Sequence, residues 1–200
     1  MTSANRIVIV HADESCLGNQ NEGLNPGGAA ALVEAGMRNG IARRDVYLSS
    51  PKTTNNQMAL AGAIHVLTCL KDPDRRRPIL YVSDSQYLVN GMTSWVRGWK
   101  ARGWKRKGGA ILNLDLWKEL DRVASLYDIR FLWVRGHAGH VKNEYADHLA
   151  VQAAQRQTAT DGFVDSNLDT WLKAQQARGR FGGYDPDADF ATLVQRYGRS

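Results

Sequence analysis

The sequence has few features of a secreted, membrane-bound or disulfide-linked protein. Its 200 residues include only two cysteines, Cys16 and Cys69, with no CxxC pair, which excludes a disulfide framework and a cysteine-rich metal site. No apolar run approaches the roughly eighteen residues that a membrane helix needs. The apolar run at residues 7–10 is too short for a signal peptide, and we expect it to be a strand. These absences favour a reducing, cytoplasmic setting without a membrane partner.

Acidic residues are missing from one strongly basic segment. The net charge of the chain is +6, and the segment 97–107 holds six basic residues and no acid. A local basic patch on an otherwise balanced surface is typical of proteins that bind a polyanion. The six residues are Arg97, Lys100, Arg102, Lys105, Arg106 and Lys107.

Apolar periodicity predicts three strands, followed by helices that alternate with two more strands. The expected strands are residues 7–11, 28–36, 45–49, 78–83 and 128–134, with turns at 37–40 and 50–52. The expected helices are residues 55–70, a helical pattern after 84, a helix–basic loop–helix unit over 95–126, and 140–155. Three meandering strands followed by crossovers imply an α/β fold with a five-stranded mixed sheet flanked by helices.

The chain is expected to divide into a domain of residues 1–156 and a C-terminal extension of residues 157–200. Residues 157–166 are polar and resemble a linker, while 167–178 and 190–197 have the spacing of short helices, with a turn or cap at 185–189. The extension also carries Trp171, Phe181, Tyr184 and Phe190. Because a disordered tail is normally poor in such residues, we expect it to pack on the domain or to mediate an interaction. A disordered tail is the alternative.

Three aspartates lie at positions where catalytic acids are common. Asp13 ends the first strand, Asp84 ends the fourth, and Asp147 lies on the last helix of the domain, one turn after Asn143. Side chains at the ends of strands in open α/β sheets project into a ligand crevice. Clustered carboxylates repel one another unless a cation lies among them, and oxygen ligands suit Mg²⁺ or Mn²⁺. Taken singly, each aspartate is more simply a turn former or helix cap.

Seven short strings resemble, in the same order, those of bacterial type 1 ribonuclease H (ribonuclease HI). The resemblance spans residues 6–155, and the strings are DESCLGN, PGG, TTNNQM, SDSQYLV, GWKARGWK, NLDLW and WVRGHAGHVKNEYADHLA. It implies a ribonuclease H-like fold with a basic protrusion. A related polynucleotide transferase or integrase is a different possibility, and the GHAGH loop and the basic protrusion argue against it.

The resemblance also implies a function. Members of that family are endoribonucleases that hydrolyse the RNA strand of RNA/DNA hybrids, using four carboxylates that hold two Mg²⁺ or Mn²⁺ ions. Asp13, Asp84 and Asp147 match three of these carboxylates. His137 matches the family histidine that assists proton movement and product release, a role that suits imidazole. We expect a monomer.

Substrate contacts are implied in the same way. Asn19, Asn55, Asn56 and Gln86 match positions that touch the backbone and minor groove of the hybrid, and amides suit the hydrogen bonding of 2′-hydroxyls. Thr54 matches a phosphate contact, and Cys16 a cysteine on the substrate side. Helix capping for the asparagines and burial for the cysteine are the simpler interpretations. In the protrusion, Trp95, Trp99 and Trp104 accompany the six cations, and we assign binding mainly to the cations.

The chain departs from the family pattern at two positions. Ala59 stands where the family has the fourth metal-binding Glu, and Glu14 stands where it usually has Gly. An engineered Glu-to-Ala change, a natural inactive hybrid-binding protein, and relocation of the carboxylate to Glu14 all remain open. Relocation explains both departures, but successive strand residues point to opposite faces. Glu14 is therefore expected to join Asp13 only if the strand ends or kinks there. The loop at 19–26 is also longer than the family pattern.

Overall fold

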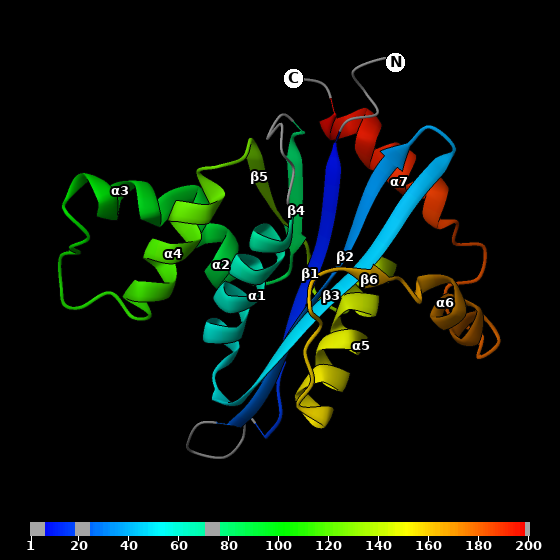
Figure 1. The fold of residues 1–200 in the computed structure, drawn as a ribbon, viewed down its shortest axis with the longest axis horizontal. Helices are drawn as coiled ribbons and strands as arrows, with labels where there is room; N and C mark the ends of the chain where they lie inside the picture. Colours follow the sequence, from blue (N-terminus) through cyan, green and yellow to red (C-terminus); the bar gives the residue numbers. More distant parts are fainter. Residues whose placement is uncertain (1–6, 19–24, 71–76, 199–200) are drawn as a thin grey trace.

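A six-stranded mixed sheet forms the centre of the fold (Figure 1). The computed structural model of the chain describes residues 7–18, 25–70 and 77–198. The strand order is β5-β4-β1-β2-β3-β6, in which β1 pairs parallel with β4 and β4 with β5, while the other neighbours are antiparallel. The strands are β1 (Val8–Cys16), β2 (Asn25–Met37), β3 (Gly40–Thr53), β4 (Ile79–Ser83), β5 (Ile129–Trp133) and β6 (Val164–Asp165).

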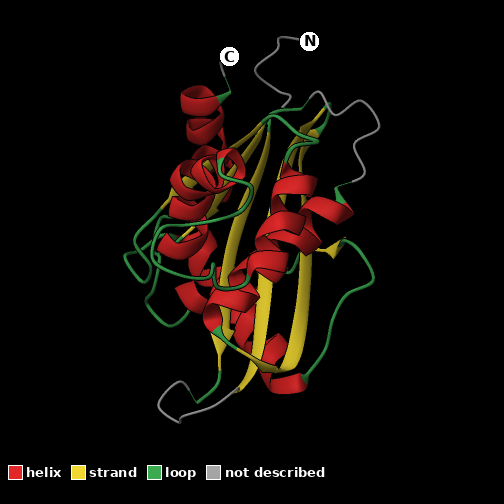
Figure 2. Cartoon of the chain, turned by 90° about the vertical axis from the view of Figure 1, so that its left-hand side faces the viewer, coloured by secondary structure: helices red, strands yellow, loops and turns green. Residues whose placement is uncertain are grey.

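Helices cover both faces of this sheet (Figure 2). Side chains alternate along β1, so Val10 packs in one core cluster with Leu60 and Trp117, and Ile9 packs in another with Phe190. Among the described residues, no helix is long and apolar enough to cross a membrane. The helical elements are α1 (Asn55–Cys69), α2 (Gln86–Asn90), the π-helical turn η2 (Gly91–Trp95), α3 (Val96–Ala101), α4 (Leu114–Ala124), α5 (Val141–Arg156), α6 (Leu168–Gln176) and α7 (Pro186–Tyr197).

The mixed α/β architecture is confirmed, but two local predictions were wrong. The turn expected at residues 50–52 is strand, because the antiparallel ladder of β3 with β2 continues to the pair Thr53 and Asn25. The linker expected at residues 157–166 contains the sixth strand, in which Val164 and Asp165 pair with Asp45 and Arg44 of β3. A two-residue strand on a sheet edge carries too few residues to show a periodicity.

The C-terminal extension packs on the domain, as its aromatic residues predict. Leu168 of α6 is buried with Tyr145 of α5, and the Trp171 and Tyr145 rings lie 5.2 Å apart. Phe190 and Val194 of α7 are buried against the face of the sheet that carries Ile9. The extension therefore contributes to the hydrophobic core.

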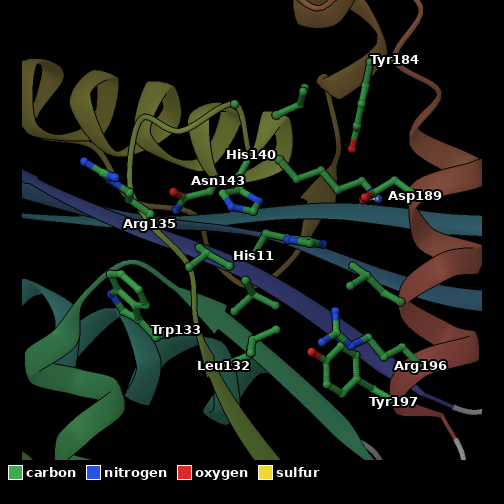
Figure 3. A pocket seen from close by; sticks show the side chains of 16 residues that line it. His11, Leu132, Trp133, Arg135, His140, Asn143, Tyr184, Asp189, Arg196 and Tyr197 are labelled. Atoms are coloured by element: carbon green, nitrogen blue, oxygen red, sulfur yellow. Dashed lines mark ion pairs between the residues drawn. The ribbon is translucent and has the colours of Figure 1, made fainter.

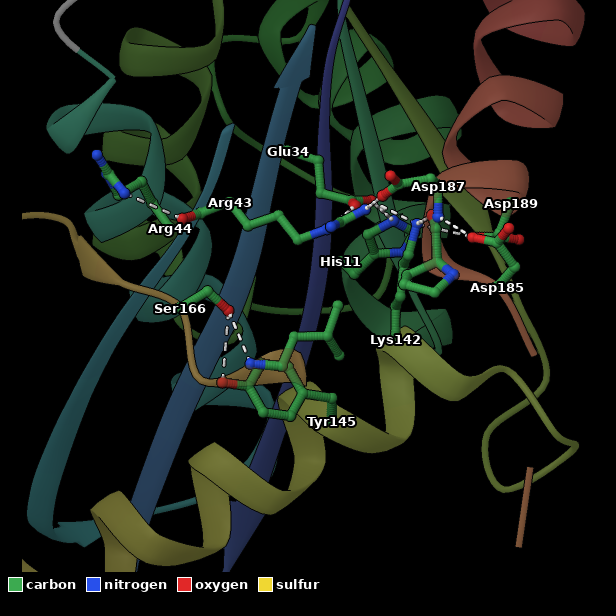
Figure 4. A network of polar contacts seen from close by, with 12 residues as sticks. His11, Glu34, Arg43, Arg44, Lys142, Tyr145, Ser166, Asp185, Asp187 and Asp189 are labelled. Carbon is green, nitrogen blue, oxygen red and sulfur yellow. Dashed lines mark hydrogen bonds and ion pairs between the residues drawn. The ribbon is translucent and has the colours of Figure 1, made fainter. Parts of the chain in front are cut away.

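A buried carboxylate lies beneath the extension (Figure 4). Glu34 of β2 is fully buried. Its carboxylate oxygens lie 2.7 Å from Nζ of Lys142, 2.8 Å from Nε of Arg43 and 3.2 Å from Nε2 of His11. Burial alone would raise the pKa of Glu34, but His11 and Lys142 outweigh it and lower the pKa to about 2. Glu34 is thus held ionised among cations.

The extension supplies two further acids to this network. Asp187 pairs with Arg43, and Asp189 lies 2.9 Å from Nζ of Lys142. Lys142 also donates to the carbonyl oxygen of Pro186 at 3.0 Å. α7 is therefore joined to the sheet and to α5 by charge as well as by apolar packing.

Candidate active site

The candidate site lies where β4 ends and its neighbour β1 continues. The last pair of the parallel ladder is Ala12 with Ser83. Beyond it, β1 stays paired only with β2 on its other side, through Asp13 and Glu14. The edge of β1 that faced β4 is open there, and Asp84 follows directly after β4. The topology thus brings three acids to one sheet edge.

These three carboxylates meet closely enough to share a cation. Asp13, Glu14 and Asp84 each offer an oxygen, and the three oxygens lie within 4.8 Å of one another. Burial and the charges of Asp84, Glu14 and Asp147 raise the pKa of Asp13 to about 9. Burial and the charge of Asp84 raise the pKa of Glu14 to about 8. Crowded, half-buried carboxylates of this kind fit a hard divalent cation, which removes their repulsion.

Glu14 joins Asp13 without any end or kink in its own strand, so the condition expected from the sequence was wrong. β1 continues in register to Cys16. Asp13 turns toward the open edge, where its Oδ1 accepts from the backbone N–H of Glu14 at 2.7 Å. Its Oδ2 accepts from Nδ2 of Asn143 at 3.0 Å, and the same amide group donates to the carbonyl oxygen of Ala12 at 3.2 Å. The two side chains leave opposite faces and meet because the adjacent strand has stopped.

Glu14 lies on the face of the sheet that α1 covers. Ala12, two residues earlier on that face, packs in the same core cluster as Ala59 of α1. Glu14 is paired with Ala29 of β2, and a Cβ on Gly62 of α1 would lie only 2.7 Å from the Cβ of Ala29. Ala59 is one helical turn before Gly62 and is buried. Glu14 therefore lies on the face of the sheet covered by the part of α1 that contains Ala59 and Gly62.

The loop after β5 packs against Asp84. Nε1 of Trp133 donates to the carbonyl oxygen of Asp84 at 3.0 Å. A Cβ on Gly136 would lie 2.2 Å from Oδ2 of Asp84, so any larger residue there would displace the Asp84 carboxylate. His137 follows with a φ of 52° and Gly139 with a φ of 84°, both in the left-handed region. Burial raises the pKa of Asp84, and the charge of His137 partly offsets the rise.

Asp147 interacts electrostatically with these acids but is not one of the three whose oxygens cluster. It lies on α5 one turn after Asn143, and its charge contributes to the raised pKa values of Asp13 and Asp84. Burial raises the pKa of Asp147 as well, and His137 and His148 oppose the rise. The four acids that the sequence singled out thus surround one edge, with Asp147 set apart from the other three.

The residues matched to single substrate contacts lie at the starts of α1 and α2 and at the end of β1, with one exception in the undescribed part of the chain. Thr54, Asn55 and Asn56 are exposed at the start of α1, and the helix is capped by Thr54, which exchanges hydrogen bonds with Gln57. The capping role considered for the asparagines therefore belongs to Thr54. Gln86 is exposed at the start of α2, and Cys16 is buried against Met58. Asn19 and the longer loop around it lie outside the described residues.

The basic protrusion consists of α3 and the loop that follows it, at the opposite end of the molecule from α6 (Figure 1). Its six cations are all exposed, and Lys100 forms an ion pair with Asp121 at 2.8 Å. Of the tryptophans, Trp99 is buried and Trp104 is half-buried, whereas Trp95 is exposed, with its ring centroid 5.9 Å from that of Trp99. The assignment of binding mainly to the cations stays a prediction.

One site residue escaped the sequence interpretation. Ser85 is buried next to Asp84, and its side chain hydrogen-bonds to the carboxylate of Glu14, which lowers the raised pKa of that acid. The string SDSQ contains it, but a serine after an aspartate looks like an ordinary turn residue. Only the position of Glu14 gives it a partner.

Comparisons with known proteins agree with this geometry. The family model described as RNase H matches residues 5–155. Ribonuclease H of Aromatoleum aromaticum is 43% identical over 156 residues, which cover 76% of this chain and 95% of that protein. Ribonuclease HI of Neisseria meningitidis is 40% identical over 151 residues, which cover 75% of this chain and 97% of that protein.

A similar solved structure bears on the altered acids. The crystal structure of LC9-RNase H1, described as a type 1 RNase H with the type 2 active-site motif, superposes with a TM-score of 0.81 and 49% identity. The match covers 88% of this chain and 85% of that one. The foamy viral protease-reverse transcriptase in complex with RNA/DNA hybrid shares the fold alone, with a TM-score of 0.63 and 15% identity over 78% of this chain and 21% of that one.

Proposed function

The chain belongs to the ribonuclease H family, and from this premise we propose that it hydrolyses the RNA strand of RNA/DNA hybrids by metal-dependent phosphodiester cleavage. The observation that carries the proposal is the group of three carboxylate oxygens from Asp13, Glu14 and Asp84 within 4.8 Å of one another. Asp147 is the fourth acid in the proposal. Mg²⁺ or Mn²⁺ bound there, as two ions when substrate is present, supplies an activated water and charge stabilisation for the leaving oxygen.

The neighbouring residues hold these acids in place. Asn143 donates to Asp13 and fixes its Oδ2, while Ser85 hydrogen-bonds to Glu14. Gly136 lets the loop close on Asp84, which places His137 near both Asp84 and Asp147. We assign to His137 the movement of a proton at its imidazole nitrogen, a role suited to a ring that can both accept and donate a proton.

Relocation of the fourth carboxylate explains the two departures from the family pattern. Glu14 projects toward α1, and Ala59 on α1 leaves no acid of its own there. The similar LC9-RNase H1, a type 1 RNase H with the type 2 active-site motif, supports a changed arrangement of acids on the type 1 fold. In this proposal Glu14 performs the work of the missing Glu.

Substrate binding is assigned to two surfaces. The exposed starts of α1 and α2 present hydroxyl and amide groups suited to 2′-hydroxyls and phosphates, from Thr54, Asn55, Asn56 and Gln86. The exposed cations of the basic protrusion are assigned to the phosphates of the DNA strand.

A hybrid-binding protein with impaired catalysis is the second candidate, and the observation that favours it is Ala59. The two candidates differ in a cleavage assay on an end-labelled RNA/DNA hybrid with Mg²⁺ or Mn²⁺, with the corresponding RNA duplex as the substrate control. We expect the native protein to cleave the hybrid, and Glu14→Gln to lower the rate at least about a hundredfold while hybrid binding persists, a loss in the range of other electrostatic catalytic groups. Binding without cleavage by the native protein with either metal favours the second candidate. Unchanged cleavage by Glu14→Gln rules out an essential role for Glu14.

A further inference from the structure

A groove lies beside the candidate active site, between α5 and the C-terminal extension (Figure 3). Its volume is about 470 Å³, in the range of pockets for small organic ligands. The floor is one row across the sheet, formed by His11 of β1, Val82 of β4 and Leu132 of β5, which are paired in register. One wall is the start of α5, and the other is α7. The second wall lies outside the residues that the family model matches.

The groove carries positive charge that the described residues leave unpaired. Arg135 lies at one end and Arg196 at the other (Figure 3), both side chains are exposed, and neither forms an ion pair within the described ranges. The acid of the groove, Asp189, is paired with Lys142 at 2.9 Å and hydrogen-bonds to Tyr184. Two cations without an ion-pair partner among the described residues therefore border the cavity, and its one carboxylate is ion-paired with Lys142, which also pairs with Glu34. This arrangement favours an anionic ligand with charge at both ends.

Aromatic rings accompany both cations. Trp133 is 42% exposed and lies beside Arg135. Tyr197 lies beneath Arg196, whose guanidinium carbon is 5.3 Å from the ring centroid. Proteins that bind single-stranded nucleic acid combine an aromatic ring with a cation, because each nucleotide offers a base that stacks on the ring and a phosphate that pairs with the cation.

We propose that this groove binds one unpaired nucleotide of a single strand, with one flanking phosphate at Arg135, the other at Arg196, and the base against Trp133 or Tyr197. The groove adjoins the acids, since Trp133 also donates to the carbonyl oxygen of Asp84 and Asn143 lines both sites. A strand that passes the acids thus reaches the groove directly. That the nucleotide belongs to a substrate strand rests on the proposed function. A free nucleotide would offer the groove the same phosphates and base.

The first arm of the test measures nucleotide binding alone. The full chain is titrated calorimetrically, without divalent ions, with adenosine 3′,5′-bisphosphate, adenosine 5′-monophosphate, adenosine and inorganic phosphate. We expect the bisphosphate to bind most tightly and to shift the indole NMR signal of Trp133. Arg135→Ala and Arg196→Ala should each weaken the bisphosphate about tenfold, the effect of one charge-assisted hydrogen bond. Arg178→Ala, on the same extension but outside the groove, should change nothing.

The second arm identifies the source of the nucleotide. Hybrids with blunt ends are compared with hybrids that carry a three-nucleotide single-stranded extension at each of the four strand ends in turn. Tighter binding of one extended hybrid, abolished in Arg196→Ala and in the groove-filling Leu193→Trp, identifies the substrate strand. Bisphosphate binding without any gain from an extension identifies a free nucleotide.

Two results would overturn the groove as a nucleotide site. One is inorganic phosphate binding as tightly as the bisphosphate, and the other is bisphosphate affinity that is the same in the native, Arg135→Ala and Arg196→Ala proteins. Because the first arm involves no cleavage, failure of the proposed ribonuclease activity leaves its readout intact. Failure of the groove likewise leaves cleavage of blunt hybrids unchanged.

Discussion

At the scale of single residues, the site is defined by acids that, without a bound metal ion, keep their protons at neutral pH. The pKa values of Asp13 and Glu14 are raised to about 9 and about 8 by burial and by the charges of neighbouring acids, chiefly Asp84. Unfolding returns both acids to ordinary pKa values near 4. Between about pH 4 and pH 9 the folded state therefore binds more protons than the unfolded state, and stability falls as pH rises.

The direction of this pH dependence gives a prediction for thermal unfolding. Without divalent ions, the melting temperature should fall from pH 5 to pH 9, and Asp13→Asn should remove much of the fall. Each kcal/mol of relieved repulsion corresponds to about 2–4 °C for a chain of this size. Asp161→Asn, a change in an exposed acid of the extension, is the matched control in differential scanning calorimetry. A melting temperature of the native protein that rises over this range contradicts the crowded-acid interpretation.

Residue-scale features divide into those visible in the sequence and those that depend on the fold. The matches of Asp13, Asp84 and Asp147 came from local strings, and the structure brings them to one edge. The sequence left relocation to Glu14 as an open alternative, and it could not show how Glu14 meets Asp13, because that depends on where the neighbouring strand β4 stops. No periodicity within β1 carries that information.

At the scale of elements, the proposed relocation moves the fourth carboxylate from α1 to β1. Ala59 is buried in the core cluster that includes Ala12. A glutamate added at position 59 beside Glu14 would place two acids in one half-buried space, at a cost in stability. A glutamate at position 59 with glycine at position 14 would return the family pattern.

Relocation of the carboxylate from position 59 to position 14 predicts a specific pattern in a double-mutant cycle. Glu14→Gly alone should lower hybrid cleavage at least about a hundredfold, and Ala59→Glu alone should lower the melting temperature. The double variant Glu14→Gly with Ala59→Glu should recover most of the activity. Initial rates at saturating Mg²⁺ give the comparison, and a double variant no more active than Glu14→Gly argues against an exchange of one carboxylate between two elements.

The basic protrusion is the second element with a measurable role. Lys105, Arg106 and Lys107 are exposed on the loop after α3. Changing all three to alanine should weaken hybrid binding uniformly across sequences. It should also reduce the slope of log affinity against log salt by up to about 0.9 for each phosphate that the protein no longer neutralises. Arg178→Ala, which removes one positive charge outside the protrusion, is the control for the loss of a single charge. An unchanged salt slope in the triple variant would mean that another surface binds the phosphates.

At the scale of the whole molecule, the extension completes the fold. α6 and α7 bury Leu168 and Phe190, and Asp187 and Asp189 pair with cations of the domain. The aromatic content of residues 157–200 predicted that the extension would pack. It did not predict where, because the cations that receive its acids and the buried Glu34 belong to distant parts of the chain and are brought together only by the fold.

Removal of the extension should therefore destabilise the rest of the chain. A chain that ends at Arg156 should lose several kcal/mol of unfolding free energy, about 1.5–3 for each large apolar side chain no longer buried. Phe190→Ala should lose about 3–5 kcal/mol, and Asp161→Asn, at an exposed position outside the helices, should be neutral. Urea unfolding measures these differences. Rapid trimming of the native chain to about residue 156 by trypsin is the contrary result.

The metal ligands themselves are tested most directly by anomalous diffraction from crystals soaked in Mn²⁺. We predict an anomalous peak at the open edge of β1, with carboxylate oxygens of Asp13, Glu14 and Asp84 at bonding distances of about 2.0–2.6 Å. A peak held by Asp13 and Asp84 with the Glu14 side chain turned away, or no peak at this edge, contradicts the assignment of Glu14 as the relocated ligand.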